Sequence, residues 1–541
     1  MSRSEPDAVA MSREEPVIDT EFGRVRGVTR GEISSFKGIP YAAAPIGPLR
    51  WRAPRPPEVW DGELDASQFG AIAPQPGLMS APKPAPVGLS NRLPAATEDC
   101  LTINVFTPAL GGAGLPVMVW IHGGAYYIGS SADPLFDGSG LASHGNVVVV
   151  TFNYRLGALG YLDFSGFAGA SEPFESNLGQ RDQLAALAWV QRNIDAFGGD
   201  PDRVTVFGES AGAGAITTLM ATPSAAGLFR AAIAESSPVG SVYSRERAHR
   251  FAARFLELVE LPENEIDRLR LLPVDQLTRA CERLVQSNPS VDPGTIAVAP
   301  VVDGELVPEY PLTAFEAGRA LPIPLIIGTN RNEALLFKLM RSSILPTSVA
   351  DIEAMMTNLG IAKGWMIPPA YDGYPSRASA LHISTDAAFR MPTIWAATAH
   401  SRYAPTWLYE FDYVRPLVKA IGFGAMHGAE LPYVWGNPFA SPLAVVPLGG
   451  ARTAAGVAAR MQARWLTFAR TLDPNPAGST TGALAIAGSV PNASAPGVVQ
   501  SWPGYDAVHR NTLVINKADH VIRDPRRKRR LAWGDEVISF Q

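Results

Sequence analysis

The chain has 541 residues, a formal net charge of −5 and two cysteines, Cys100 and Cys281. The slightly acidic balance argues against a nucleic-acid-binding surface, and two cysteines in so long a chain do not make a disulfide framework. Hydrophobic residues make up 46% of the sequence and charged residues 18%, as in an ordinary globular protein with a large core. No uninterrupted run of 18 apolar residues occurs, so the sequence predicts no membrane span.

The N-terminal segment is polar and acidic and lacks the apolar stretch of a signal peptide. We therefore expect a flexible leader over residues 1–16 and a cytoplasmic location, with export by another route left open. Residues 17–541 are expected to form a single domain, because no linker separates two halves and no internal repeat occurs. The basic run at residues 526–530 is interpreted as a solvated tail or helix end rather than as a polyanion site.

Short apolar runs alternate with helical patterns along the chain. A helix is predicted at residues 180–198, where apolar residues recur every three or four positions. Near-continuous apolar strands suit a sheet buried on both faces, and their alternation with helices predicts a mainly parallel sheet with crossover helices. The predicted strands are residues 115–121, 146–152, 203–207, 323–327 and 406–411.

Two insertions interrupt this alternation. Residues 240–320 and 334–400 are mostly helical in pattern, and we expect them to cover the ends of the sheet as a lid. Two segments rich in Pro, Gly and Ala, residues 72–97 and 474–498, are interpreted as long surface loops.

The most informative segment is Gly-Glu-Ser-Ala-Gly at residues 208–212. It follows the predicted strand 203–207 and precedes a stretch able to form a helix, residues 213–221. Strand, sharp turn and helix are the context in which a G-x-S-x-G pattern forms a nucleophile elbow. Glycine is needed because the serine sits on a strained turn, where neighbouring side chains would clash. Ser210 is therefore the candidate nucleophile, and a plain glycine-rich turn is the alternative.

A serine hydroxyl needs a base in contact with it, and that base needs an orienting acid. The histidines after Ser210 are His249, His382, His400, His427, His509 and His520. His427 is favoured because it lies in a loop shortly after the predicted strand 406–411, from which a base can reach over the sheet edge. For any other histidine, a surface or core role is the preferred interpretation.

The acid should lie just beyond the C-terminal end of a strand. Glu333 meets this condition, because it follows the predicted strand 323–327. The competitor, Asp303, is interpreted as a turn residue. For Glu333 itself, the alternative is a solvated carboxylate at a helix start.

Acyl transfer also requires donors for the tetrahedral oxyanion, and backbone N–H groups serve because they are rigid. His-Gly-Gly-Ala at residues 122–125 follows the predicted strand 115–121 and offers such donors. Ala211, the residue after the candidate nucleophile, offers another.

From about Thr20 to the C-terminus, the chain resembles a type-B carboxylesterase of the cholinesterase-like branch of the α/β-hydrolases. The resemblance rests on the motifs at residues 36–41, 48–51, 98–105, 197–212, 328–333 and 427–436. It implies an α/β-hydrolase fold, with a mostly parallel central sheet flanked by helices and with helical insertions forming a lid over an active-site gorge. It also implies Ser210 as nucleophile, Glu333 as acid and His427 as base.

Further site residues follow from the same resemblance. Ser236 matches a serine that supports the triad from behind, although the glycine that usually follows is Ser237 here. Glu209, from its position beside the nucleophile and not from the resemblance, either lines the pocket or has a structural role in the elbow. The implied oxyanion donors are Gly123, Gly124, Ala125 and Ala211.

Two departures from the family pattern matter. Many relatives pair the cysteine of the second motif with an earlier one, but this chain has alanine there, so Cys100 is expected to be a free, buried thiol. Choline-binding relatives hold an aromatic residue in the same loop to stack on quaternary ammonium. Residues 73–97 contain no Phe, Tyr or Trp, so acetylcholine is not expected as a substrate.

The predicted function is hydrolysis of small to medium apolar carboxylic esters through an acyl-enzyme. No metal or organic cofactor is expected, and the protein is expected to be a monomer or small homo-oligomer. An amidase or carbamate hydrolase with the same triad is the first alternative. A catalytically silent adhesion-type relative, or a scaffold that only binds a ligand, is the second, and the three filled triad positions argue against it.

Overall fold

A computed structural model describes residues 15–77, 93–168, 170–342, 344–358, 364–437, 449–479 and 500–534. Most of the predicted leader and much of the two predicted loops, 72–97 and 474–498, lie outside these ranges. Within them, no helix is long and apolar enough to cross a membrane.

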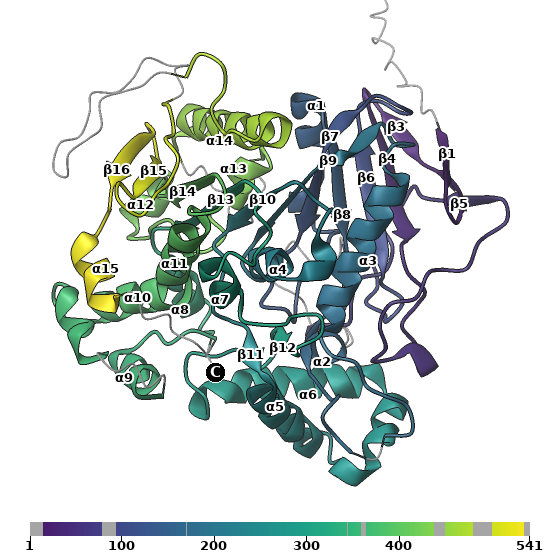
Figure 1. Ribbon diagram of the computed structural model, residues 1–541, viewed down its shortest axis with the longest axis horizontal. Coiled ribbons are helices and arrows are strands. Elements are labelled where there is room, and N and C mark those ends of the chain that lie inside the picture. The colour runs from purple at the N-terminus through teal and green to yellow at the C-terminus, as the bar shows by residue number, and fades with distance from the viewer. Residues whose placement is uncertain are drawn as a thin grey trace, which may run out of the picture.

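An 11-stranded sheet in the order β16-β15-β14-β13-β10-β9-β7-β8-β6-β4-β3 forms the centre of the molecule (Figure 1). From β8 to β15 every neighbouring pair is parallel, whereas β16 at one edge and β6, β4 and β3 at the other pair antiparallel. The prediction of a mostly parallel sheet is thus confirmed. The strands are β3 (Val28–Arg30), β4 (Ile33–Pro40), β6 (Thr102–Thr107), β7 (Leu115–Ile121), β8 (Val148–Phe152), β9 (Gly199–Glu209), β10 (Ala231–Glu235), β13 (Leu325–Asn330), β14 (Thr406–Phe411), β15 (Asn511–Ile515) and β16 (His520–Arg523).

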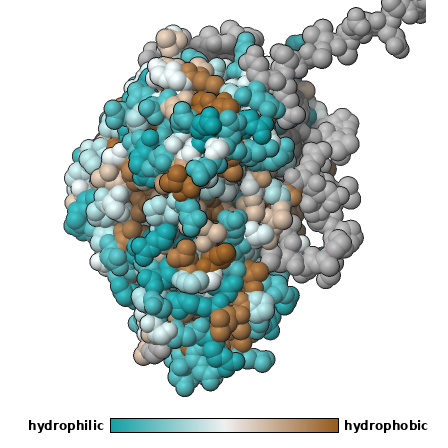
Figure 2. Space-filling model, turned by 90° about the vertical axis from the view of Figure 1, so that its right-hand side faces the viewer, coloured by the Kyte–Doolittle hydropathy of each residue, from teal (hydrophilic) through white to brown (hydrophobic). Residues whose placement is uncertain are grey.

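The sheet is buried on both faces, as the apolar strands predicted. Along β7, Val117, Val119 and Ile121 belong to one hydrophobic core, whereas Met118 and Trp120 belong to a second. Because successive side chains of a strand point to opposite faces, the two cores lie on opposite sides of the sheet. On the face shown in Figure 2, hydrophilic residues predominate and hydrophobic residues form small separate patches.

Helices cover the two faces. Side chains of α3 (Leu178–Asn193) and α4 (Ala211–Met220) belong to the first core, and side chains of α1 (Ser139–Gly145) and α14 (Ala451–Thr471) belong to the second. The remaining helices of this framework are α2 (Gly157–Tyr161), α12 (Pro416–Ala420), α13 (Leu431–Val434) and α15 (Arg527–Trp533). A separate three-stranded sheet consists of β1 (Val17–Thr20), β2 (Gly23–Arg26) and β5 (Glu63–Asp65).

Strand starts differ from prediction where the backbone forbids pairing. The strand predicted from residue 146 begins at Val148, because Asn146 has a φ of 47° and caps α1 in a left-handed conformation. The strand predicted from residue 323 begins at Leu325, because Pro324 has no N–H to donate to a ladder.

Both predicted insertions are largely helical. The first contains β11 (Tyr243–Ser244), α5 (Arg245–Leu258), α6 (Val274–Ser287), β12 (Val301–Val302) and α7 (Pro311–Glu316). The second contains α8 (Ala334–Leu339), α9 (Val349–Asn358), α10 (Arg377–Thr385), the π-helical turn η8 (Asp386–Arg390) and α11 (Met391–His400). In Figure 1, α5 and α6 lie together at the bottom of the molecule, whereas α9 and α10 lie at its left and lower left, near α8 and α15.

Candidate active site

The nucleophile elbow is a strained turn between β9 and α4. Ser210 has φ 57° and ψ −125°, a conformation that side-chain-bearing residues rarely adopt. Its N–H donates to the carbonyl of Glu235 at 2.9 Å. A Cβ on Gly212 would lie 2.0 Å from the carbonyl oxygen of Ile121, so only glycine fits beside the serine. The sequence therefore folds here as the G-x-S-x-G pattern predicts, with Ser210 between strand and helix.

The loop after β7 lies against this elbow. Ile121 at the end of β7 pairs with Gly208 of β9, and a Cβ on Gly123 would lie 3.1 Å from the Cβ of Ser210. None of the backbone hydrogen bonds among the described residues uses the N–H of Gly123, Gly124 or Ala125. Ala211 is the first residue of α4, where an N–H has no acceptor within the helix. The N–H groups of these four residues thus have no backbone acceptor among the described residues, and their role as oxyanion donors stays a prediction.

His122 holds this loop in place, a role that the sequence interpretation missed. Its Nδ1 lies 2.9 Å from the carbonyl oxygen of Gly123, and its ring stacks on Tyr154 with centroids 4.4 Å apart. The Tyr154 hydroxyl donates to the His122 carbonyl at 2.6 Å. Burial lowers the pKa of His122 to about 4, so the ring is neutral and Nδ1 donates to Gly123.

His427 and Glu333 form a buried pair. Nδ1 of His427 lies 2.7 Å from Oε2 of Glu333, whose side chain is fully buried. Oε1 of Glu333 accepts from the Asn330 N–H and from the Ser236 hydroxyl, each at 2.6 Å. Because the carboxylate can only accept, it fixes the histidine proton on Nδ1 and leaves Nε2 able to take a proton.

Nε2 of His427 faces the elbow. It lies 3.2 Å from Oε1 of Glu209, the residue directly before Ser210. The rings of Phe389 and Phe337 lie 4.7 and 5.2 Å from the imidazole, so apolar side chains exclude water from this part of the site. The structure thus brings His427 to the nucleophile elbow from a loop more than 200 residues further along the chain.

Three buried carboxyl groups act on the histidine: Glu209, Glu333 and Glu430. Burial raises the pKa of Glu209 to about 7, although His427 pulls it down, and burial with the nearby charges of Glu209 and Glu333 raises the pKa of Glu430 to about 8. Burial alone would lower the pKa of His427. The charge of Glu209 and the hydrogen bond that His427 donates to Glu333 outweigh burial and raise that pKa to about 9.

Glu430 and Asn330 were also not identified as site residues from the sequence. Asn330 donates through its side chain to Glu430, and the Ser236 hydroxyl lies 3.3 Å from Oε1 of Glu430. The position of Glu430, three residues after His427, was the available signal, since a carboxylate so near a candidate base bears on its charge.

The competing candidates are engaged elsewhere. Asp303 accepts from the N–H groups of Glu305 and Val307 at 3.0 and 2.9 Å, which confirms its interpretation as a turn residue. His249 stacks on Phe167, Nε2 of His400 lies 2.8 Å from the carbonyl of Ile323, and His509 pairs with Asp506.

Cys100 is free and buried, as expected from the missing partner cysteine. Burial raises the thiol pKa of both Cys100 and Cys281 above the ordinary range, so neither is a reactive thiolate. In the ranges that the structure describes, no group of three or more His, Cys, Asp or Glu side chains is arranged to hold a metal ion.

A parallel sheet with a serine elbow at the end of one strand and a histidine loop after a later strand defines an α/β-hydrolase. The model of the carboxylesterase family matches residues 14–533. A para-nitrobenzyl esterase from Bacillus subtilis is 38% identical over 529 residues, which cover 95% of this chain and 97% of the relative. Carboxylesterase 4A from Bos taurus is 32% identical, with 86% of this chain and 88% of the relative covered. A solved structure titled thermophilic PNB esterase has a TM-score of 0.82 and 36% identity, covering 96% of this chain and 99% of that one.

The chain therefore belongs to the carboxylesterase family, and its fold is that of the α/β-hydrolases. The resemblance seen in the sequence motifs is confirmed. The protein is a carboxylesterase, a hydrolase of ester bonds.

Proposed function

We propose that the protein hydrolyses carboxylic esters through a Ser210-His427-Glu333 triad and a covalent acyl-enzyme. The observation that carries this proposal is the 2.7 Å contact between Nδ1 of His427 and Glu333, with Nε2 of the same ring turned toward the elbow. A histidine oriented in this way is a general base for a serine hydroxyl.

The first half-reaction forms the acyl-enzyme. The Ser210 oxygen attacks the ester carbonyl carbon while its proton passes to Nε2 of His427, and Glu333 stabilises the imidazolium that forms. The carbonyl oxygen becomes an oxyanion, which accepts hydrogen bonds from N–H groups of Gly123, Gly124, Ala125 and Ala211. When the tetrahedral intermediate collapses, the C–O bond breaks and the alcohol leaves with the proton from His427.

The second half-reaction releases the acid. A water molecule gives a proton to Nε2 of His427 and attacks the acyl carbon, and Ser210 leaves with that proton. The sum is one ester and one water converted to one carboxylic acid and one alcohol, so no metal or organic cofactor is required.

Two neighbours act through the triad. Ser236 donates to Glu333 and holds its carboxylate toward His427. Glu209 lies against Nε2 and stabilises the protonated imidazole of the intermediate, which is the state that carries a positive charge. Ser236 is a positioning residue, because it acts through Glu333, whereas Glu209 contacts Nε2 of His427, the nitrogen that takes the proton.

We further propose small to medium apolar esters as substrates, because the rings of Phe337 and Phe389 lie against the imidazole of His427. An amide or carbamate is the alternative, since it needs the same nucleophile and differs mainly in protonation of the leaving group.

The test is a chain-length series of nitrophenyl esters with matched anilides, given to the wild type and to Ser210→Ala. We expect turnover of esters that is lost in Ser210→Ala. A folded wild type that cleaves none of the esters would overturn the proposal, and faster cleavage of the anilides would favour the amidase.

A further inference from the structure

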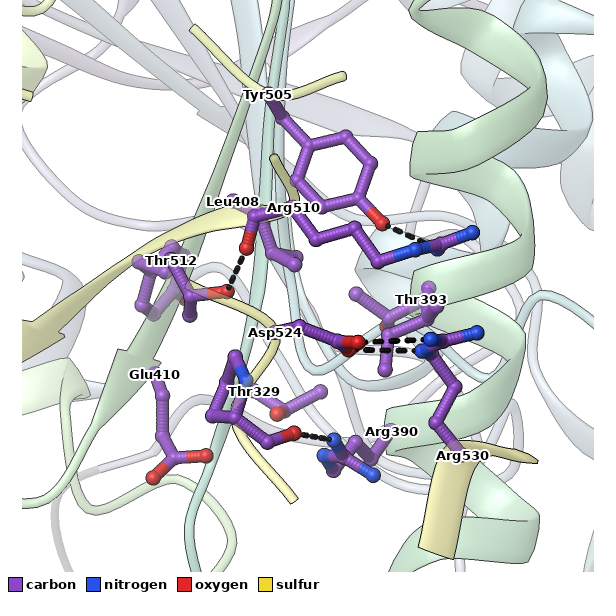
Figure 3. A pocket seen from close by; sticks show the side chains of 13 residues that line it. Thr329, Arg390, Thr393, Leu408, Glu410, Tyr505, Arg510, Thr512, Asp524 and Arg530 are labelled. Carbon is purple, nitrogen blue, oxygen red and sulfur yellow. Dashed lines mark hydrogen bonds and ion pairs between the residues drawn. The ribbon is translucent and has the colours of Figure 1, made fainter. Parts of the chain in front are cut away.

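The pocket between β14, β15 and α11 is lined by polar side chains that satisfy one another (Figure 3). Asp524 accepts from Arg530 at 2.8 and 2.7 Å, and Arg510 donates to the Tyr505 hydroxyl at 3.0 Å. These contacts join packed elements to one another. Buried Gln75 is different, because its amide pairs with the backbone of the loop that carries the candidate oxyanion donors.

Gln75 is 5% exposed and binds both backbone groups of Gly129. Its Oε1 accepts from the Gly129 N–H at 2.9 Å, and its Nε2 donates to the Gly129 carbonyl at 2.9 Å. Nε2 also donates to the carbonyl of Ala73 at 3.0 Å. The amide thus pairs with a single residue on both its donor and its acceptor side, and it fixes the position of Gly129.

Gly129 packs against the residues that form the candidate oxyanion hole. It has a φ of 118°, and a Cβ built on it would lie 2.4 Å from the Gly123 carbonyl oxygen and 2.6 Å from Nδ1 of His122. A Cβ on Gly124 would in turn lie 2.0 Å from the carbonyl oxygen of Ile128, the residue before Gly129. Because no space separates these groups, a displacement of Gly129 is transmitted to Gly123 and Gly124.

Asn153 joins the same two segments of the chain a second time. Its Oδ1 accepts from the Ser131 N–H at 2.9 Å, and its Nδ2 donates to the carbonyl of Ala71 at 3.1 Å. Asn153 directly follows β8, so this bridge is anchored in the central sheet. Residues 71–75 are therefore a support fixed to the sheet, and Gln75 extends that support to the loop after β7.

We propose that Gln75 is a positioning residue for ester hydrolysis, which holds the loop after β7 so that its N–H groups are in place for the oxyanion. Hydrogen bonds to the oxyanion form only as the tetrahedral intermediate forms, and they are strong only when the donors are fixed beforehand. Without the clamp on Gly129, the loop relaxes, and the intermediate loses stabilisation that the bound ester never had. This inference rests on the proposed function, because it takes the same loop as the source of oxyanion donors.

The first test is Gln75→Leu, which removes all three hydrogen bonds of the amide and keeps a similar side-chain volume. We expect kcat on a nitrophenyl ester to fall about tenfold or more, with KM within about twofold of the wild type. Gln191→Leu is the matched control, because Gln191 on α3 likewise donates to two backbone carbonyls, those of Pro201 and Leu228, at 2.8 and 3.0 Å. The control should keep the wild-type kcat.

A trifluoromethyl ketone distinguishes positioning from packing. The Ser210 oxygen bonds to its carbonyl carbon, the serine proton passes to His427, and the carbonyl electron pair moves to oxygen, so the inhibition constant reports stabilisation of an oxyanion. The corresponding alcohol forms no such adduct and reports ordinary binding. We expect the Ki of the ketone to rise about tenfold or more in Gln75→Leu, and the Ki of the alcohol to stay within about twofold.

Two results would overturn the inference. Unchanged kcat and ketone Ki in Gln75→Leu would show that the loop keeps its arrangement without the clamp. Equal losses of affinity for ketone and alcohol would show a general distortion of the site, and thermal melting of both variants is measured alongside.

If Gln75→Leu does not fold, Gln75→Glu takes its place. A protonated carboxylic acid keeps an acceptor for the Gly129 N–H and a donor for its carbonyl, whereas the carboxylate has lost the donor. We expect the kcat of Gln75→Glu, divided by that of the wild type at the same pH, to fall between pH 5 and pH 8. A constant ratio would contradict the clamp.

Failure of the proposed function gives a different result. The wild type would then neither cleave the ester nor bind the ketone more tightly than the alcohol, and both proposals would fall together. A defect expected in Gln75→Leu but not found, with an active and ketone-sensitive wild type, removes the role of Gln75 alone.

Discussion

Nε2 of His427 and Oε1 of Glu209 lie 3.2 Å apart, so the ring nitrogen that Glu333 leaves free meets a second buried carboxyl group. The two groups titrate together, because each changes the charge that the other experiences. This pair couples the candidate base to the residue next to the nucleophile. The pH dependence of catalysis therefore reports the protonation of His427 and Glu209.

The first prediction concerns Glu209→Gln. A general base must be neutral, so the acid limb of kcat/KM follows deprotonation of His427. The charge of Glu209 raises the pKa of His427, and its removal lowers that pKa. The base is then neutral at lower pH, and we expect the acid limb to move down by about one pH unit. An acid limb at the wild-type position would show that Glu209 does not act on the base.

The second prediction concerns Glu333→Gln. The amide keeps the size of the side chain but cannot stabilise the imidazolium, and we expect kcat to fall by roughly 10³-fold to 10⁴-fold. Thermal melting should show a folded protein, since the amide oxygen can still accept from Asn330 and Ser236. Glu305→Gln, on an exposed turn, is the control. A loss below tenfold would remove Glu333 from the triad.

The third prediction compares two neighbouring serines. Ser236→Ala removes the hydroxyl that donates to Glu333 at 2.6 Å, a charge-assisted bond worth about 1.5–3 kcal/mol. We expect kcat to fall about tenfold or more, with little change in KM. Ser237→Ala is the matched control, because the Ser237 hydroxyl contacts Thr217 instead. Equal effects of the two substitutions on kcat would indicate a general packing defect.

The fourth prediction concerns stability. Burial, with the charge of Glu430, raises the pKa of Glu235 well above its ordinary value. The unfolded chain releases this proton at lower pH than the folded protein does. Above the unfolded pKa the folded state therefore holds one more proton, and this group makes the free energy of unfolding fall as pH rises, by up to about 1.4 kcal/mol per pH unit.

Glu235→Gln removes that dependence and can still accept the 2.7 Å bond from Trp465. We expect the melting temperature of the variant to exceed that of the wild type by a margin that grows between pH 5 and pH 8. A margin that stays constant over this range would mean that Glu235 is ionised in the folded protein.

Much of the fold was predictable because its strands are short apolar runs at the positions where a buried sheet needs them. β7 and β14 have the predicted bounds, whereas β8 and β13 start later at an αL asparagine and after a proline. Those shifts depend on local backbone conformation, which cannot be predicted from hydrophobic periodicity.

The candidate residues were predictable for another reason. Ser210, Glu333 and His427 each follow a recognisable strand, so strand order alone brings them to one edge of the sheet. Ser236 was implied by the resemblance, but the contacts of Glu430 were not predictable, because they join it to Asn330 and Ser236 across distant segments.

The central claim is that Ser210 is the nucleophile, and covalent labelling tests it most directly. Wild type and Ser210→Ala are treated with an organophosphate, digested and analysed by peptide mass spectrometry alongside residual ester hydrolysis. We expect one adduct on the peptide that contains Ser210, loss of activity in proportion to the adduct, and no adduct in the variant. A label on another residue that abolishes activity, or full activity with Ser210 labelled, would contradict it.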